Sequence, residues 1–387
     1  MAATRAIDPK PAEKPDKPDI PDVSTMAAKA SPRRRPRAWR WADIGEFAGS
    51  AASALLLTWL IFDRFLPFRI QGVAFVVAWY VLTLPIYWLV VRDGHGPVTA
   101  RDRLASVLIT TGAALALSPI FLVVGYVTIR GIGVIDFGFL AETMELTGPL
   151  SEAGDGGLLH SLIGTLEQLG IATLIAVPLG VLTAVYLSEI SGPLARPTRL
   201  VADAMTALPS IVAGLFVYSI VVIRTGWGFS GFAGSLALTI LMLPTVTIAA
   251  EQVLRVVPGS LREAALALGS PYWRSVLLVV LPTARAGLAT AVILGMARVV
   301  GETAPVLLTV GGTNILNVNP FSDYQDNIPL FVFNQIRSSK ETFVERAWGG
   351  ALLLLILVLV LFVLARLAGG AGPGGRSSRR RRKAAAK

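Results

Sequence analysis

The sequence predicts an all-α protein that crosses a membrane several times. Its 387 residues are 53% hydrophobic and 16% charged, with a mean hydropathy of +0.64, whereas a soluble domain carries about a quarter charged residues. The apolar residues are gathered in runs that reach the roughly 20 residues of a membrane-spanning helix. We therefore expect eight spans, at residues 47–62, 72–91, 104–129, 161–188, 200–223, 235–254, 286–310 and 347–365.

The positive charge is concentrated beside the apolar spans. Residues 33–40 hold five arginines, and residues 366–387 hold eight Arg and Lys with no acidic residue. Such clusters are typical of segments that bind anionic lipid, and no nucleic-acid-binding pattern accompanies them. The predicted loops carry 27 Arg and Lys on one side of the membrane and 7 on the other. The positive-inside rule therefore predicts that both termini are cytoplasmic.

Several kinds of chemistry are disfavoured by what the sequence lacks. It contains no cysteine and only two histidines, so it offers no disulfide, thiolate nucleophile or histidine metal cluster. It contains neither a GxxxxGK[ST] phosphate-binding loop nor a GxSxG nucleophile turn. We therefore expect no catalytic residue, no metal ligand and no nucleotide hydrolysis in this chain.

One cytoplasmic segment, 255–285, has the pattern of a folded unit. Ser260 and Glu263 have the spacing of a capping box, which predicts a helix start. Leu261, Ala265 and Leu268 share one face of that helix, Arg262 faces away from it, and Gly269 stands where a left-handed residue would end it. Ser270 and Pro271 then predict the N-cap and first turn of a second helix, which Pro282 should interrupt.

The same segment carries a longer motif. Glu263, Ala264 and Ala265 are followed after three residues by Gly269, and after nine more by Val279, with Leu281 and Pro282 next. This spacing resembles the EAA loop of ABC-importer permeases, with Val279 in place of the usual isoleucine. The resemblance implies that Glu263, Ala264, Ala265, Gly269, Leu281 and Pro282 couple this chain to an ATPase.

The resemblance extends over about Arg101 to Arg366, roughly two thirds of the chain. In this range the sequence is similar to the PstA family, the permease subunits of bacterial phosphate importers. The runs that carry the similarity are ALPSIVAGLFVY, LREAALALG, GETAP at 301–305 and IPLFVFN at 328–334. It implies a permease that moves inorganic phosphate into the cytoplasm and is not itself an enzyme.

Family membership also implies a fold and a set of partners. The fold would be a six-helix type I (MetI-like) ABC-importer core, preceded here by an additional two-helix extension. The implied partners are a homologous permease, PstC, a dimer of the ATPase PstB, and the phosphate-binding protein PstS. ATP and Mg²⁺ would be bound by the ATPase, and the assembly would lie in the bacterial inner membrane.

These interpretations divide the chain into four parts. Residues 1–45 are predicted to be a disordered basic tail, 46–100 an extra transmembrane hairpin, 101–366 the permease domain and 367–387 a second basic tail. The purpose of the hairpin and the tails is left open, as are the selectivity and affinity for phosphate.

Charged residues inside a predicted span require an explanation, because each costs about 2.5 to 3.5 kcal/mol on insertion scales. Arg298 and Glu302 are four residues apart in the span predicted at 286–310, with Thr303 beside them. Arg298 could face the transport pathway and bind a phosphate oxyanion while Glu302 holds it in place. Alternatively, the two residues form an ion pair that only fixes helix packing.

Three other functions are compatible with parts of the sequence. A permease for another oxyanion or small solute would share the EAA loop but would not be expected to carry GETAP and IPLFVFN. A channel or an ion-coupled carrier would have no use for an EAA loop, and co-purification with an ATPase distinguishes it. A membrane scaffold acting through its basic tails would lose its function when those tails are deleted.

Overall fold

The computed structural model describes residues 41–65, 72–148, 151, 155–190 and 192–369. All regular elements in these ranges are helices, and one isolated β-bridge joins Gly311 to Gln325. The helices are α2 (Trp41–Leu60), α3 (Val73–His95), α4 (Pro97–Gly131), α5 (Phe137–Ala141), α6 (Leu159–Val185), α7 (Ala195–Thr206), α8 (Ser210–Val217), α9 (Gly231–Val256), α10 (Gly259–Ala267), α11 (Tyr272–Ser275), α12 (Leu281–Val299), α13 (Ala304–Leu307), α14 (Ile328–Ile336) and α15 (Glu341–Gly369). Short π-helical segments extend four of them: η1 (Ile61–Phe65), η2 (Tyr186–Ile190), η3 (Tyr218–Arg224) and η4 (Val276–Val280). The all-α prediction is confirmed for the described residues.

The chain forms two compact units, Met1–Leu117 and Ser118–Lys387. The division falls inside α4, the helix in whose first turn the predicted boundary at 100/101 also lies. The predicted N-terminal tail reaches to residue 45, but α2 already begins at Trp41, and the rest of that tail lies outside the described residues. At the other end α15 continues to Gly369, and the remainder of the C-terminal tail is likewise outside them.

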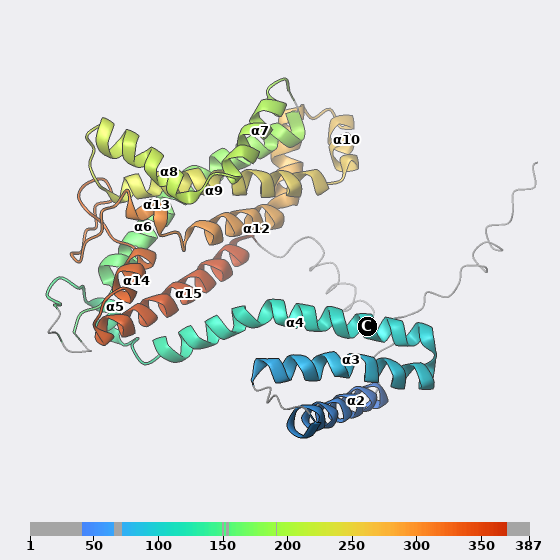
Figure 1. The fold of residues 1–387 in the computed structure, drawn as a ribbon. Coiled ribbons are helices and arrows are strands. Elements are labelled where there is room, and N and C mark those ends of the chain that lie inside the picture. The colour runs from blue at the N-terminus through green and yellow to red at the C-terminus, as the bar shows by residue number, and fades with distance from the viewer. Residues whose placement is uncertain (1–40, 66–71, 149–150, 152–154, 191, 370–387) are drawn as a thin grey trace, which may run out of the picture. The chain divides into compact units, whose positions relative to one another are not determined.

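In the first unit, α2, α3 and the start of α4 pack against one another (Figure 1). The rings of Phe47 and Tyr87 meet edge to face at 5.3 Å, and the Trp79 indole donates to the Ala51 carbonyl. The Arg103 guanidinium pairs with both Asp43 and Glu46 at 2.5 Å, which balances the charge at one end of these helices.

In the second unit, α9 is the central helix, and more than half of its most apolar stretch is buried. It packs against α6 and α12, and α12 in turn packs against α15. Val246 of α9 fits between two glycines, since a Cβ on Gly180 of α6 would lie 3.0 Å from it and a Cβ on Gly295 of α12 only 2.5 Å. The small residues therefore let three helices approach closely, as is common where helices meet inside membranes.

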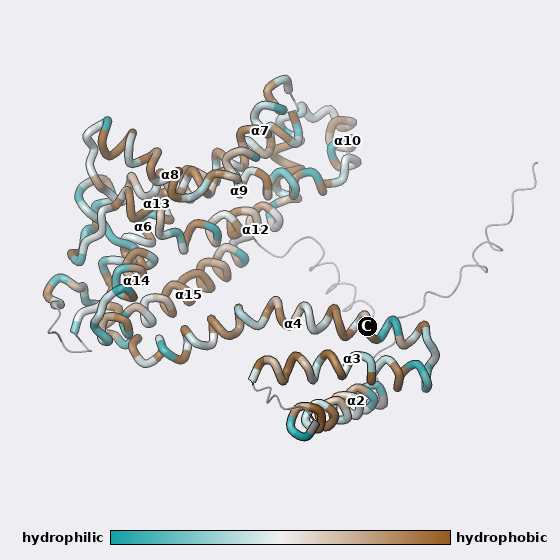
Figure 2. Tube along the Cα trace, viewed as in Figure 1, coloured by the Kyte–Doolittle hydropathy of each residue, from teal (hydrophilic) through white to brown (hydrophobic). Residues whose placement is uncertain are grey.

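Seven helical segments in the described residues are long and apolar enough to cross a membrane, and the count reaches eight if one bent pair forms a single span. Figure 2 shows apolar residues along the long helices and hydrophilic residues gathered near helix ends and loops. The bent pair is α7 with α8–η3, which meet at 104°. The span predicted at 200–223 is thus divided into two helices. Pro209 causes the break, because it has no amide hydrogen and disfavours helical geometry at Leu208.

The span predicted at 286–310 is displaced along the chain. The helical segment begins at Tyr272, runs through η4 into α12, and ends at Val299. A short turn and α13 then follow, and a Cβ on Gly214 of α8 would lie 2.5 Å from the Pro305 Cα atom. Residues 300–310 therefore lie against α8 rather than continuing α12.

Candidate functional site

The predicted EAA loop forms a helix, a glycine corner and a second helix. α10 ends at Ala267, and Gly269 has φ +77°. The Gly269 amide donates to the Leu266 carbonyl at 2.9 Å, and the Ser270 amide donates to the Ala265 carbonyl at 3.2 Å. These two bonds form a Schellman motif, in which the left-handed residue is most often glycine. The predicted role of Gly269 in the backbone is confirmed.

The start of α10 differs from the prediction. The helix begins at Gly259 with Pro258 as its N-cap, and no side chain caps it. Ser260 is therefore inside the first turn, so the predicted capping box with Glu263 is wrong. The Pro258 carbonyl accepts from the Leu261 amide at 3.2 Å, and Pro258, with φ −57° and ψ 132°, turns the chain out of α9.

The second helix also differs in two details. Pro271, not Ser270, is the N-cap of α11, so the helix begins one residue later than predicted. Pro282 does not interrupt the helix, because α11, η4 and α12 continue as one 28-residue span. The wider π turn of η4 precedes Leu281 and Pro282, and such a turn accommodates a residue that has no amide hydrogen.

The apolar face of α10 points away from the rest of the chain. No residue of α10 is buried, and Leu268 just after it is 89% exposed. Glu263 and Ala264 are exposed and Ala265 is half-buried. A short amphipathic helix with small residues and an uncovered apolar face is suited to lie in a groove of another protein.

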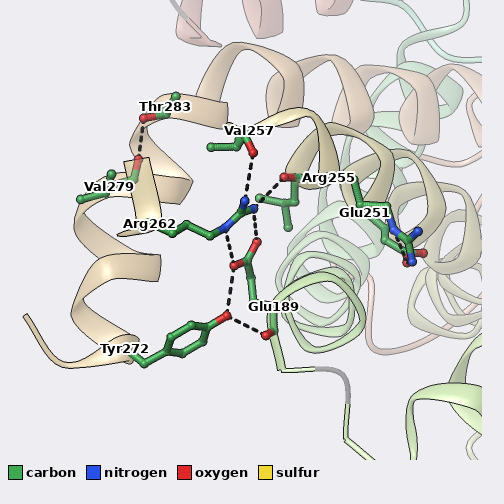
Figure 3. A network of polar contacts seen from close by, with 9 residues as sticks. Glu189, Glu251, Arg255, Val257, Arg262, Tyr272, Val279 and Thr283 are labelled. Carbon is green, nitrogen blue, oxygen red and sulfur yellow. Dashed lines mark hydrogen bonds and ion pairs between the residues drawn. The ribbon is translucent and has the colours of Figure 1, made fainter. Parts of the chain in front are cut away.

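The opposite face of α10 is fixed to the body of the unit through Arg262 (Figure 3). Its guanidinium forms a two-pronged contact with the Glu189 carboxylate, at 2.8 Å through Nε and 2.6 Å through an Nη atom. It also donates to the carbonyls of Val257 at 2.9 Å and Leu254 at 3.1 Å. The Tyr272 hydroxyl donates to the Glu189 carbonyl at 2.6 Å. The Glu189–Arg262 pair, together with Tyr272, therefore joins η2, the end of α9, α10 and α11.

A second ion-pair cluster lies nearby on α9 (Figure 3). The Glu251 carboxylate, whose side chain is 6% exposed, pairs with Arg255 at 2.8 Å and with Arg199 of α7. Neither these three residues nor Glu189 is among the site residues predicted from the sequence. The one signal in the sequence was the presence of acids near the ends of apolar runs, where each needs a cationic partner.

The predicted pathway residues are placed differently from the prediction. Arg298 is an exposed residue in the last turn of α12, whereas Glu302 follows the helix end and Thr303 is the N-cap of α13. The predicted i,i+4 arrangement on one helix is therefore wrong, and no ion pair joins Arg298 to Glu302 within the ranges that the structure describes. Since a helix rises 1.5 Å per residue, Arg298 is about 25 Å along α12 from Pro282. Leu281 and Pro282 of the predicted coupling set and Arg298 of the predicted pathway set thus lie at opposite ends of α12.

Comparisons with known proteins place this arrangement in a family. Residues 176–369 match the family described as "Binding-protein-dependent transport system inner membrane component". This match contains α9, the α10 corner and α12. The chain belongs to this family, and it is accordingly a multi-pass transport component of a membrane.

The individual relatives described here are all phosphate transport permeases. The chain is 41% identical over 262 residues to the phosphate transport system permease protein PstA 1 of Mycobacterium tuberculosis (strain ATCC 25618 / H37Rv), covering 66% of this chain and 84% of the relative. It is 39% identical over 276 residues to PstA of Mycobacterium leprae (strain TN), covering 70% and 89%. PstA of Yersinia pestis is 39% identical over 221 residues, covering 57% and 74%.

Two solved structures align with part of the chain. An inward-facing structure of the MetNI methionine ABC transporter aligns with a TM-score of 0.42 and 20% identity, covering 55% of this chain and 91% of the other. An amino acid ABC transporter with histidines aligns with a TM-score of 0.41 and 19% identity, covering 55% and 92%.

Proposed function

We propose that this chain is the permease subunit of an ATP-driven ABC importer that moves inorganic phosphate into the cytoplasm. The observation that carries the proposal is the identity of about 40% to phosphate permeases over two thirds of the chain. The family match at 176–369 includes the EAA loop. The exposed α10 corner supports it, because a permease without its own ATPase needs a surface on which one can act.

The partners follow from the same proposal. PstC would complete the translocation pathway, a PstB dimer would bind the α10 corner and hold ATP and Mg²⁺, and PstS would deliver phosphate from outside. Both termini would be cytoplasmic, since Arg and Lys are concentrated in the loops on that side. The basic clusters would bind anionic lipid of the bacterial inner membrane.

The contacts of α10 suggest how ATPase motion reaches the spans. The ATPase would hold α10 through exposed residues such as Glu263 and Ala264, while Arg262 is bonded to Glu189 and to the carbonyls of Leu254 and Val257 at the end of α9. Leu281 and Pro282 start α12 directly beyond the corner. A displacement of α10 would therefore act on η2 with α6, on α9 and on α12 together.

Arg298, Glu302 and Thr303 are proposed to lie along the phosphate pathway at the far end of α12. An exposed guanidinium offers paired hydrogen bonds to an oxyanion. A site with one arginine also lets the ion leave, which transport requires. Glu302 would limit trapping of the anion.

Substitution of Arg298 distinguishes contact with phosphate from a packing role. Arg298→Gln is expected to reduce initial phosphate uptake by at least about tenfold at wild-type levels of assembled complex, and Arg298→Lys to restore little, because an ammonium lacks the planar fork. The double change Arg298→Gln/Glu302→Gln should remain inactive. Recovery of uptake in the double variant would instead show that each residue only neutralises the other.

The transported solute is tested with the whole assembly in vesicles. We expect ATP-dependent uptake of phosphate when this chain is assembled with PstC, PstB and PstS, and none when it is omitted. Sulfate, molybdate and an amino acid serve as competing solutes, each with its own binding protein. Uptake of one of these in place of phosphate would assign the chain to another ABC importer.

A further inference from the structure

A buried carboxylate lies in the segment between α13 and α14. Asp326 is 4% exposed, and its Oδ2 atom accepts from the Ser161 hydroxyl at 2.6 Å. The segment can lie this close to α6 because residue 164 is glycine, where a Cβ would collide with the Asp326 carbonyl oxygen. The Ile328 amide donates to the Thr165 hydroxyl, which fixes the next turn. The position of the carboxylate is thus set by α6.

The negative charge of the Asp326 carboxylate has no Arg or Lys side chain beside it in the described residues. Within the described residues, Oδ1 has no hydrogen-bond partner, and no Arg or Lys forms an ion pair with Asp326. The titratable group facing it from α6 is His160, whose Nε2 atom is 3.7 Å from Oδ2. α14 carries no charged residue, and residues 311–325 carry only the exposed Asp323. Burial raises the pKa of Asp326 to about 7, although hydrogen bonds from the Ser161 hydroxyl and the Asn327 backbone amide act in the opposite direction.

Asp326 is one of the residues that line a polar pocket of about 270 Å³. Gly311 and Gly312, with φ +80° and +71°, line the pocket, and a Cβ on Gly312 would lie 4.0 Å from Oδ1. The other polar lining residues are Thr313, Asn314, Asn334 and Gln335. Asn314 and Asn334 are exposed, so the pocket is reached from solvent.

This donor set suits a particular class of ion. Carboxylate, amide, hydroxyl and carbonyl oxygens are the ligands of hard cations such as the alkali and alkaline-earth ions. One carboxylate is neutralised by one positive charge, whereas a divalent ion would leave a net buried charge. The pocket volume also allows some water to stay bound, because each water occupies about 30 Å³.

We propose that the pocket formed by Gly311–Asn314, Asp326 and α14 binds a monovalent alkali cation, with Asp326 as its charged ligand. The ion balances the buried carboxylate and fixes the segment 311–327 against α6. A proton on Asp326 competes with the ion, so the affinity for the cation falls as the pH falls below about 7.

The test is the thermal unfolding of the purified full chain in NaCl, KCl or choline chloride at equal ionic strength. Above pH 7, we expect Na⁺ or K⁺ to raise Tm by about 5 °C over choline at about 100 times its Kd. In choline chloride, Asp326 has a lower pKa in the unfolded chain than in the folded chain. At a pH between these two values, the folded chain holds a proton on Asp326 that the unfolded chain has lost. The free energy of unfolding of the chain therefore falls as the pH rises towards about 7. Above about pH 7, the stabilisation by the protonated Asp326 is lost.

Asp326→Asn keeps the side-chain shape and should abolish both the cation effect and this pH dependence. Glu145→Gln, at an exposed acid outside the pocket, should change neither. If Asp326→Asn does not fold, the exposed lining residue offers a second variant, Asn334→Leu, which should weaken the cation effect several-fold.

Two results would overturn the proposal: equal Tm in all three salts, or a cation effect that persists in Asp326→Asn. Equal Tm with the pH dependence retained would show that a proton shared with His160 balances the charge instead.

Discussion

Gly269→Val is expected to separate the permease from its ATPase without preventing membrane insertion. Gly269 has φ +77°, and a Cβ added there would meet no heavy atom within 4 Å, so the cost comes from the backbone alone. A β-branched residue in this region costs about 1 to 3 kcal/mol, which corresponds to about tenfold or more in an association constant. The corner would relax by unwinding the end of α10, and the exposed residues Glu263 and Ala264 would be misdirected.

The measurement is the amount of PstB retained per permease and its phosphate-stimulated ATP hydrolysis. Gly259→Val is the matched control, because Gly259 also has open space around it but does not have a positive φ. Gly269→Asn should retain most of the activity, since asparagine tolerates the left-handed region. Normal coupled hydrolysis by Gly269→Val would contradict a role of the corner in ATPase coupling.

Removing the Arg262 side chain should be the most damaging single change on the other face of α10. The Glu189 side chain is 1% exposed and that of Arg262 is 22% exposed. Arg262→Ala leaves the Glu189 carboxylate buried without a cationic partner, and the loss of one partner of a buried pair costs about 3 to 5 kcal/mol. Arg262→Lys should recover little, because an ammonium cannot reproduce the two-pronged contact. We expect a lower Tm and a loss of uptake.

The double variant Glu189→Gln/Arg262→Gln separates stability from coupling. It has no uncompensated charge, so its Tm should return close to that of the wild type. Uptake per ATP hydrolysed should stay low, because the ionic link from α10 to η2 is still missing. Arg274→Ala is the control, since Arg274 is exposed and its guanidinium lies over the neighbouring Trp273 ring. Full coupling in the double variant would show that Arg262 has a structural role only.

The features that the sequence predicted correctly are local ones. The Gly269 corner follows from a glycine at the end of an amphipathic run, and the long helices follow from apolar runs. Hydropathy predicts an apolar segment over 200–223 but does not give the 104° bend at Pro209, because averaging hides a single proline between two apolar segments. Hydropathy also extended the span predicted at 286–310 beyond the helix end at Val299, because the sequence GETAPVLLTV is itself apolar enough to lengthen the run.

The contacts that hold the site together could not be predicted in this way. Arg262 and Glu189 are 73 residues apart, and Ser161 and Asp326 are 165 apart. No spacing rule relates such pairs, because their proximity depends on how α6, α9 and the segments around them pack. The prediction that Pro282 interrupts the helix failed for a related reason. The π turn of η4 that accommodates the proline has no marker in the residue pattern.

The most direct test of ATP-driven phosphate import is uptake and ATP hydrolysis measured together in vesicles that contain this chain, PstC and PstB. We predict that phosphate accumulates inside only when PstS is outside and ATP is on the α10 side. We also predict that ATP hydrolysis rises with phosphate-loaded PstS, and that Gly269→Val abolishes both responses. Phosphate accumulation that continues without ATP, or that is unaffected by Gly269→Val, would contradict this account.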